Sequence, residues 1–148
     1  MCYNNLGDSV KIDVLSYQYI ESLIDLLSKC FPEVDIDNNR IDKIVNNNNM
    51  ISLVGIKDNV VIANAILTLK FDYIKNKKIF YLDYFCVSPD ERNQGYGTML
   101  FNYISELAKK MNVDYMTFTS NDARVFAHKL YLKNGCQLKP TSVFVKQF

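Results

Sequence analysis

The fold is decided by one short stretch of the chain, which reads Val87-Ser88-Pro89-Asp90-Glu91-Arg92-Asn93-Gln94-Gly95-Tyr96-Gly97-Thr98. It joins an apolar segment, typical of a buried strand, to a long helix whose apolar residues recur at spacings of three and four. The N–H groups that open a helix have no partner within it, and the helix dipole is positive at that end. The stretch therefore predicts a phosphate- or pyrophosphate-binding turn, to which Arg92 can add a charged contact.

A turn softened by glycine that binds nothing is the alternative interpretation of this stretch. The strand before it, the stop at Pro89, the position of Arg92 and the amphipathic helix after it together favour phosphate binding. A dinucleotide-binding Rossmann site and a P-loop are excluded, because neither the three-glycine fingerprint nor a GKS or GKT motif occurs. The stretch also follows antiparallel strands, whereas a Rossmann fingerprint follows the first strand of a parallel sheet.

Outward from this stretch, the apolar periodicity predicts an alternation of strands and helices. The expected strands are 10–14, 51–57, 60–71, 79–87, 115–119, 136–138 and 142–146, and a tight turn at 58–59 makes a hairpin of the second and third. The expected helices run from an N-cap at Ser16 to Phe31, over 39–45, over 96–111 and over 124–134, the last closed by Gly135. We expect a single α/β domain over 1–148, with a mixed, mostly antiparallel sheet of six to seven strands and about four flanking helices.

Composition narrows the class of protein further. About half of the 148 residues are hydrophobic (49%), and Lys+Arg 17 against Asp+Glu 16 leaves a net charge of +1. That balance argues against a protein held on nucleic acid by phosphate attraction. The absence of an apolar run of about 20 residues and of a signal-peptide layout predicts a cytoplasmic protein without a membrane partner. The cysteines, Cys2, Cys30, Cys86 and Cys136, form no CxxC pair, and with His128 as the single histidine no metal site is expected.

The chain resembles the GCN5-related N-acetyltransferase (GNAT) family at two motifs. Residues Arg92-Asn93-Gln94-Gly95-Tyr96-Gly97 match the family's R/Q-x-x-G-x-G/A pyrophosphate loop, and Val87-Ser88-Pro89 match the V-x-P that precedes it. Residues Ala127-His128-Lys129-Leu130-Tyr131-Leu132-Lys133-Asn134-Gly135-Cys136 are similar to its A-x-x-(F/L)-Y-x-K-x-G-F segment. The order of elements matches over essentially the whole chain, and the likeness is specific from Phe80 to Cys136.

The resemblance implies acetyl-CoA as acyl donor and a set of residues that bind it. Arg92 and the amides of Asn93, Gln94, Gly95, Tyr96, Gly97 and Thr98 would hold the pyrophosphate. Main-chain groups of Phe85, Cys86 and Val87 would bond the pantetheine arm beside a bulge that splays the sheet. The family often has an asparagine seven residues before its tyrosine. Arg124 stands there in this chain, and Asn121, one turn earlier, is a candidate for that contact.

The resemblance also makes Tyr131 the general acid that protonates the departing thiolate. A phenol with a pKa of about 10 keeps its proton at neutral pH, whereas a thiol has a pKa of about 8.5. The alternative for Tyr131 is a tyrosine packed in the core. Some members carry a glutamate base on the strand after the long helix. The matching residue here is Thr119, which cannot act as a base.

Asp83 is the candidate base, because an alkylammonium with a pKa of about 10.4 must lose a proton before it attacks. We expect it on the face of its strand that carries Ile79, Tyr81, Phe85 and Val87, and a carboxylate among apolar neighbours is a functional candidate. A structural aspartate, paired with a lysine or with main-chain N–H groups, is the equal alternative. His128 is expected as a solvated residue of its helix, with a proton relay as the alternative.

These residues together predict an acetyl-CoA-dependent N-acetyltransferase that acts by direct attack, with a small-molecule primary amine as acceptor. A protein lysine or N-terminal acetyltransferase is one alternative, and a non-catalytic acetyl-CoA-binding sensor is another. Cys86 is not expected to act as a nucleophile, because no histidine or acid is spaced to activate it. Association of two copies through the C-terminal strands, as a homodimer, is left open.

Overall fold

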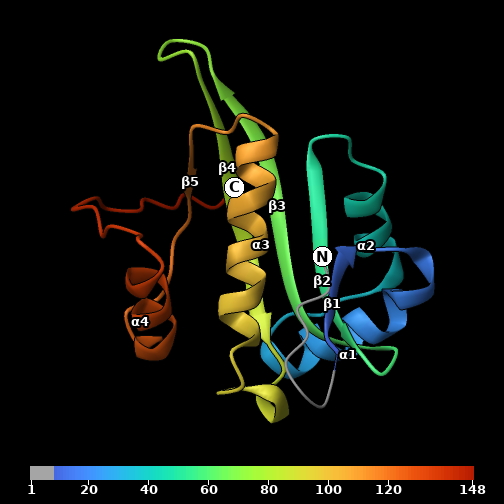
Figure 1. Ribbon diagram of the computed structural model, residues 1–148. Coiled ribbons are helices and arrows are strands. Elements are labelled where there is room, and N and C mark those ends of the chain that lie inside the picture. Colours follow the sequence, from blue (N-terminus) through green and yellow to red (C-terminus); the bar gives the residue numbers. More distant parts are fainter. Residues whose placement is uncertain (1–8) are drawn as a thin grey trace.

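The protein is a twisted sheet with helices on both faces, as the computed structural model in Figure 1 shows for residues 9–148. The strands are β1 (Lys11–Val14), β2 (Met50–Lys57), β3 (Val60–Asp72), β4 (Lys77–Val87) and β5 (Tyr115–Thr117). The helices are α1 (Ile20–Cys30), α2 (Asn38–Val45), α3 (Tyr96–Lys110) and α4 (Val125–Lys133), with short 3₁₀ turns η1 (Tyr17–Tyr19) and η2 (Pro89–Glu91). Cys2 lies outside the described residues.

The strands follow one another across the sheet in the order of the chain. The first four are antiparallel, and β5 runs parallel to β4. Asp58 and Asn59 both have positive φ, at 49° and 61°, which is the conformation of a two-residue hairpin turn between twisted strands. The expected hairpin and the mixed, mostly antiparallel sheet are confirmed.

Two apolar clusters, one on each face, hold the helices to the sheet. The cluster on the α3 side is centred on Phe80, Leu67, Leu100 and Ile104, all of which are fully buried. The cluster on the other side includes Leu23, Leu27 and Ile41 from α1 and α2. Because the apolar stripe of α3 lies against β3 and β4, the turn that precedes this helix is fixed at the end of β4.

The start of the first helix differs from the expectation. Ser16 has extended φ and ψ but makes no side-chain hydrogen bond, and a 3₁₀ turn, η1, separates it from α1. The helix over 38–45 does have a side-chain cap, because Asp37 accepts a bond of 2.9 Å from the main-chain N–H of Arg40. Capping therefore explains the start of α2, whereas α1 begins where its apolar residues first contact the sheet.

The expectation of six to seven strands is wrong for the described residues, because the strands expected over 136–138 and 142–146 do not form. Alternating apolar residues predicted them, yet no strand pairs with this segment, and the apolar side chains after Cys136 face outward. Phe144 is 93% exposed, and Leu138 and Val145 are also exposed. A strand needs a hydrogen-bonding neighbour, and local periodicity cannot supply one.

No helix between residues 9 and 148 has the length and apolar character needed to cross a bilayer.

We predict that Phe80→Ala lowers the free energy of unfolding by about 3–5 kcal/mol, because this fully buried ring joins β4 to α3 and a cavity would remain. Phe144→Ala is the matched control and should change it by less than about 0.5 kcal/mol. Urea unfolding followed by circular dichroism measures both. Equal losses for the two variants would contradict this assignment of the core.

Candidate active site

The turn before α3 presents main-chain N–H groups that the helix does not use. Gly95, the N-cap of α3, has φ 86° and Asn93 has φ 62°, so the chain passes twice through the left-handed region. The first bond within the helix runs from the N–H of Met99 to the carbonyl of Gly95, at 3.0 Å. The N–H groups of Tyr96, Gly97 and Thr98 come before that bond, and together with the helix dipole they favour an anion.

The two glycines of the turn have different roles. A side chain at Gly95 would meet nothing within 4 Å, so this glycine leaves the approach to the turn open and provides the positive φ. A Cβ at Gly97 would lie 2.9 Å from Cδ1 of Leu130 and 3.7 Å from Cγ2 of Val87. Gly97 therefore allows α3 to pack closely on α4 and on the end of β4.

Side chains fix the turn at both ends. The guanidinium Nε of Arg92 donates to the carbonyl of Val87 at 3.3 Å. The carboxylate of Glu91 accepts from Nζ of Lys57 at 3.2 Å and from Nε2 of Gln94 at 3.0 Å. The carboxylate of Glu91 is thus paired with Lys57, and the guanidinium of the exposed Arg92 lies beside the turn.

The C-terminal part of β4, residues 85–87, has an open edge beside this turn. β5 pairs only with Ile79–Tyr81 of β4, so the sheet ends there on that side. The N–H of Ser88 donates to Ile62 of β3 at 2.8 Å, and Cys86 pairs with Asn64. Because antiparallel pairing alternates, Phe85 and Val87 direct their main-chain groups to the open edge. A guanidinium nitrogen of Arg124, just before α4, is 3.4 Å from the carbonyl of Phe85.

A bulge at Tyr84 separates the two parts of β4. Asp83 is opposite Ile66 and Cys86 is opposite Asn64, so two residues of β4 face one of β3, and Tyr84 has φ 46°. This bulge confirms the one that the family resemblance implied. It also shows that the expected face for Asp83 is wrong in part: the extra residue turns Phe85 and Val87 to the α3 side.

Tyr131 of α4 lies in the core beside the open edge. It is 6% exposed, and its ring contacts Phe118 at 4.6 Å and both Phe85 and Phe101 at 6.0 Å between centroids. Burial raises the pKa of its hydroxyl, and the nearby Arg124 opposes that rise. The phenol therefore keeps its proton at neutral pH, whether it acts as an acid or only packs.

His128 differs from the expectation of a solvated helix residue. It is half-buried, and its Nε2 is enclosed without a hydrogen-bond partner among the described residues. This side of α4 therefore lies against the protein and not in water.

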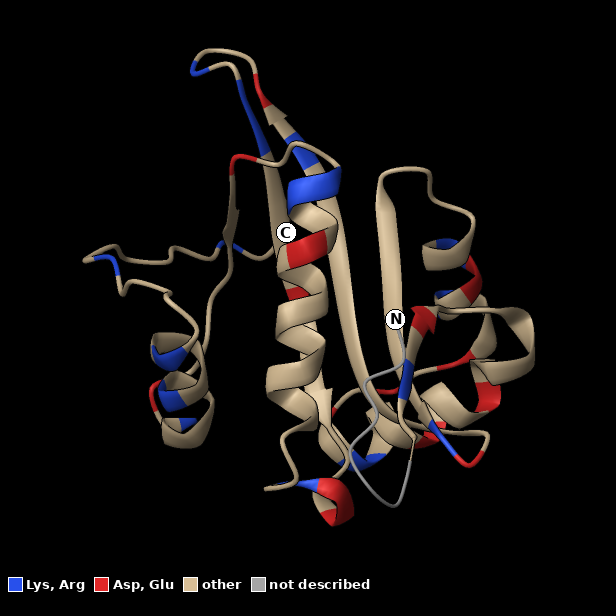
Figure 2. Ribbon diagram, in the orientation of Figure 1, with Lys and Arg blue, Asp and Glu red and all other residues tan. Residues whose placement is uncertain are grey.

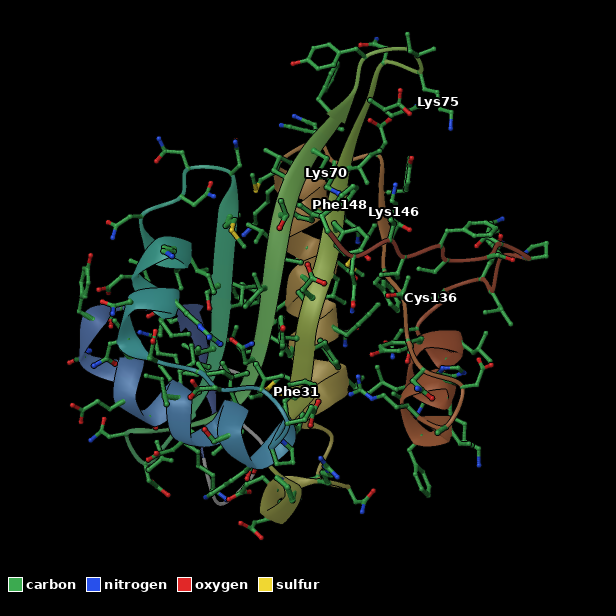
Figure 3. The ribbon with its side chains drawn as sticks, turned by 180° about the vertical axis from the view of Figure 1, so that it is seen from behind. Phe31, Lys70, Lys75, Cys136, Lys146 and Phe148 are labelled. Carbon is green, nitrogen blue, oxygen red and sulfur yellow. The ribbon has the colours of Figure 1, made fainter. Side chains whose placement is uncertain are left out.

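Asp83 is on the face of the sheet opposite α3, which Figure 3 views directly. Phe31, at the end of α1, lies beside the lower part of β4, and Lys70 lies higher on β3. Desolvation raises the pKa of the Asp83 carboxyl, and the positive charge of Lys70 opposes that rise. Nζ of Lys70 is 4.7 Å from the ring centre of Tyr81. A half-buried carboxylate with a raised pKa binds a proton more tightly than an exposed one, which suits a general base.

A thiol pair that the sequence did not indicate lies at the end of β4. Sγ of Cys30, the last residue of α1, is 3.7 Å from the carbonyl of Val87. Hydrogen bonding to the Cys86 thiol, helped by the charges of Arg92 and Arg124, lowers the pKa of Cys30 to about 7. The same contact, together with burial, raises the pKa of Cys86. The two cysteines are far apart in the sequence, and no motif links them.

Two further residues named from the sequence lie near the start of α4. Oδ1 of Asn121 accepts from the N–H of Ala123 at 2.9 Å, and its carbonyl accepts from Arg124, also at 2.9 Å, so Asn121 forms the turn that opens the helix. Thr119 is exposed after the end of β5.

The arrangement fits a diphosphate joined to an extended amide-containing arm. The N–H groups at the start of α3 and Arg92 suit the diphosphate, and the open edge of β4 suits an arm that pairs as a strand does. Figure 2 shows acidic and basic residues interspersed over most elements, so the attraction for an anion is local to the turn. Between residues 9 and 148, no group of three or more His, Cys, Asp or Glu side chains could hold a metal ion.

Comparisons with known proteins agree with this geometry. The sequence model of the acetyltransferase (GNAT) family matches residues 20–136. No curated protein matches the chain.

Solved structures with the same fold cover nearly the whole chain. An aminoglycoside N-acetyltransferase in complex with CoA is 17% identical, with a TM-score of 0.83 over 98% of this chain and 99% of that one. A GNAT family acetyltransferase from Staphylococcus aureus is 24% identical, with a TM-score of 0.76 over 94% and 98%. A ribosomal-protein-alanine N-acetyltransferase from Brucella melitensis biovar Abortus is 16% identical, with a TM-score of 0.81 over 94% and 99%.

We predict that Cys30 is the most reactive described thiol at neutral pH, because alkylation requires the thiolate and its pKa is about 7. The rate of its modification by iodoacetamide, followed by peptide mass spectrometry, should be half-maximal near pH 7. Cys136 is the control, because burial raises the pKa of its thiol. A midpoint for Cys30 at the ordinary value of about 8.5, or above it, would contradict the prediction.

Proposed function

This chain belongs to the acetyltransferase (GNAT) family, whose members carry out acetyl-CoA-dependent N-acetylation, and from that membership we propose that it acetylates a primary amine of a small molecule. One observation carries the proposal. The start of α3 lies beside the open edge of β4, since a Cβ at Gly97 would be 3.7 Å from Cγ2 of Val87 and Arg92 donates to the Val87 carbonyl. A diphosphate and an amide-containing arm would thereby be recognised side by side.

Donor binding follows from the main-chain groups at this junction. The N–H groups of Tyr96, Gly97 and Thr98 would bind the diphosphate, and Arg92 would add a charge-assisted contact. Phe85 and Val87 would pair with the arm, because their main-chain groups point to the open edge, while Cys86 pairs with β3. Arg124 occupies part of that edge through the Phe85 carbonyl and would move aside or bond to the donor.

The acceptor would bind on the opposite face of the sheet, above the end of α1 (Figure 3). Tyr84 is 43% exposed there and packs edge-on against Phe31, with ring centres 5.2 Å apart. The carboxylate of Asp83 lies one residue before Tyr84. Aromatic rings and a carboxylate suit an organic amine, which is apolar over its body and cationic at its nitrogen.

The chemical step would be a direct displacement. Asp83, directly or through water, would take a proton from the ammonium, and the freed nitrogen would form a bond to the acetyl carbon. The N–H of Val87, at the open edge, would donate to the oxyanion. As the carbon–sulfur bond breaks, Tyr131 would give its proton to the sulfur. The attacking nitrogen would lose its second proton to water, and Tyr131 would regain a proton from that water.

We predict that Tyr131→Phe lowers kcat by about 10²- to 10⁴-fold and leaves the Kd for CoA unchanged, because the ring still fills the core and only the acid is lost. Thiol release from acetyl-CoA with a panel of amines measures kcat, and calorimetry measures Kd. Tyr115→Phe, at an exposed tyrosine of β5, is the matched control. Equal turnover by Tyr131→Phe and the parent would remove Tyr131 as the acid. CoA binding without turnover of any amine by the parent would favour a sensor.

We predict that Asp83→Asn removes the acidic limb of the pH profile of kcat/KM. In the parent, kcat/KM should fall as the pH drops through the raised pKa of Asp83, because the base is then protonated. The variant should be slow and should keep only the rise set by the amine's own pKa of about 10.4. Asp25→Asn, on the exposed face of α1, is the control. A profile that Asp83→Asn leaves unaltered would remove Asp83 as the base.

A further inference from the structure

Asn64 is the most deeply buried polar side chain of the sheet, with 0% exposure. It lies in the middle of β3, between Ala63 and Ala65, which belong to the α3-side cluster. Its Nδ2 donates to the carbonyl of Tyr84 at 2.9 Å, and its Oδ1 accepts from the hydroxyl of Ser52 at 3.4 Å. A buried amide is costly unless it is bonded, so its place in an apolar interior calls for a reason.

The residue that Asn64 bonds to is the strained one. Tyr84 has φ 46°, a left-handed conformation that is unfavourable for a residue with a Cβ. Turned out of the regular ladder, its carbonyl loses the strand partner that it would otherwise have. Asn64 supplies that partner from the neighbouring strand, at the point where the register of β3 and β4 shifts.

The bulge sets which main-chain groups and side chains of β4 point toward the proposed donor site and the proposed acceptor site. On the C-terminal side of the bulge, the main-chain groups of Phe85 and Val87 point to the open edge. At it, the ring of Tyr84 projects onto Phe31, on the opposite face. We propose that Asn64 is a positioning residue of the acetyl transfer: it holds the Tyr84 bulge and thereby presents the edge at Phe85 and Val87 to the acyl donor. This inference rests on the proposed function, and it adds a residue that no motif indicates.

The test compares variants at the two ends of the bond. Asn64→Ala removes the donor, and Asn64→Leu removes it while keeping most of the volume, so that a cavity is not the cause of any effect. Ser52→Ala is the matched control, because it removes only the longer contact at the other end of the same amide. Tyr84→Gly removes the cost of positive φ and should let the bulge form without help.

Two measurements are made well below the melting temperature of each variant. Hydrogen exchange in the unliganded protein should speed up at Cys86 and Ser88, whose N–H groups face β3, in both Asn64 variants and not in Ser52→Ala. Calorimetry should show CoA binding weakened about tenfold in both Asn64 variants. In the double variant Asn64→Ala with Tyr84→Gly, CoA affinity should return to that of Tyr84→Gly alone, even though the melting temperature stays low.

Three results would overturn the inference. One is a lower melting temperature in the Asn64 variants with unchanged exchange at Cys86 and Ser88, which would make Asn64 a packing residue only. Another is unchanged CoA affinity in a parent that binds CoA. The third is a failure of Tyr84→Gly to restore binding. A parent that does not bind CoA would instead refute the proposed function, and the exchange measurement would still decide whether Asn64 holds the bulge.

Discussion

This structure depends on main-chain groups that neither a helical turn nor a neighbouring strand pairs. A helix cannot bond its own first N–H groups, and a strand at the end of a sheet cannot bond its outer edge. Here both kinds meet at one place, because α3 starts where β4 ends and β5 pairs only with Ile79–Tyr81. In the proposed function, a ligand with phosphates at one end and amides along its length would bond to these groups.

The β4 strand carries or contacts the groups proposed to bind the donor, to accept a proton and to donate one. Its outer edge would face the donor, its face opposite α3 carries Asp83, and the ring of Tyr131 packs on Phe85 from the α3 side. A regular strand would alternate strictly between the two faces, so that a side chain and its second neighbour share a face. The bulge at Tyr84 breaks this alternation and places two residues only two positions apart, Asp83 and Phe85, on opposite sides of the sheet.

Local sequence patterns predicted most of the helices and strands. The contacts that were not predicted join residues far apart in the sequence. The helix over 96–110 and the turn at Asp58 and Asn59 follow from spacing and from residue type, which the sequence shows directly. The pairing of Cys30 with Cys86, and that of Asn64 with Tyr84, join elements far apart in the chain, and nothing near any of these residues marks a partner. The prediction of strands over 136–138 and 142–146 was wrong for the converse reason. The alternating apolar pattern is present there, but no neighbouring strand pairs with it.

The charges around β4 explain how a protein with a net charge of +1 could attract an anionic and a cationic ligand at different places. Arg92 and Arg124 both donate to carbonyls below the bulge, where they lower the pKa of Cys30 and would attract an anionic donor. Asp83 lies on the N-terminal side of the bulge, where its carboxylate would attract a cationic amine. The positive charge that acts on the Asp83 carboxyl is that of Lys70, whereas those of the two arginines act on Cys30. Attraction between oppositely charged groups in a partly desolvated site is then available to each ligand separately, and the two meet only where β4 changes its register.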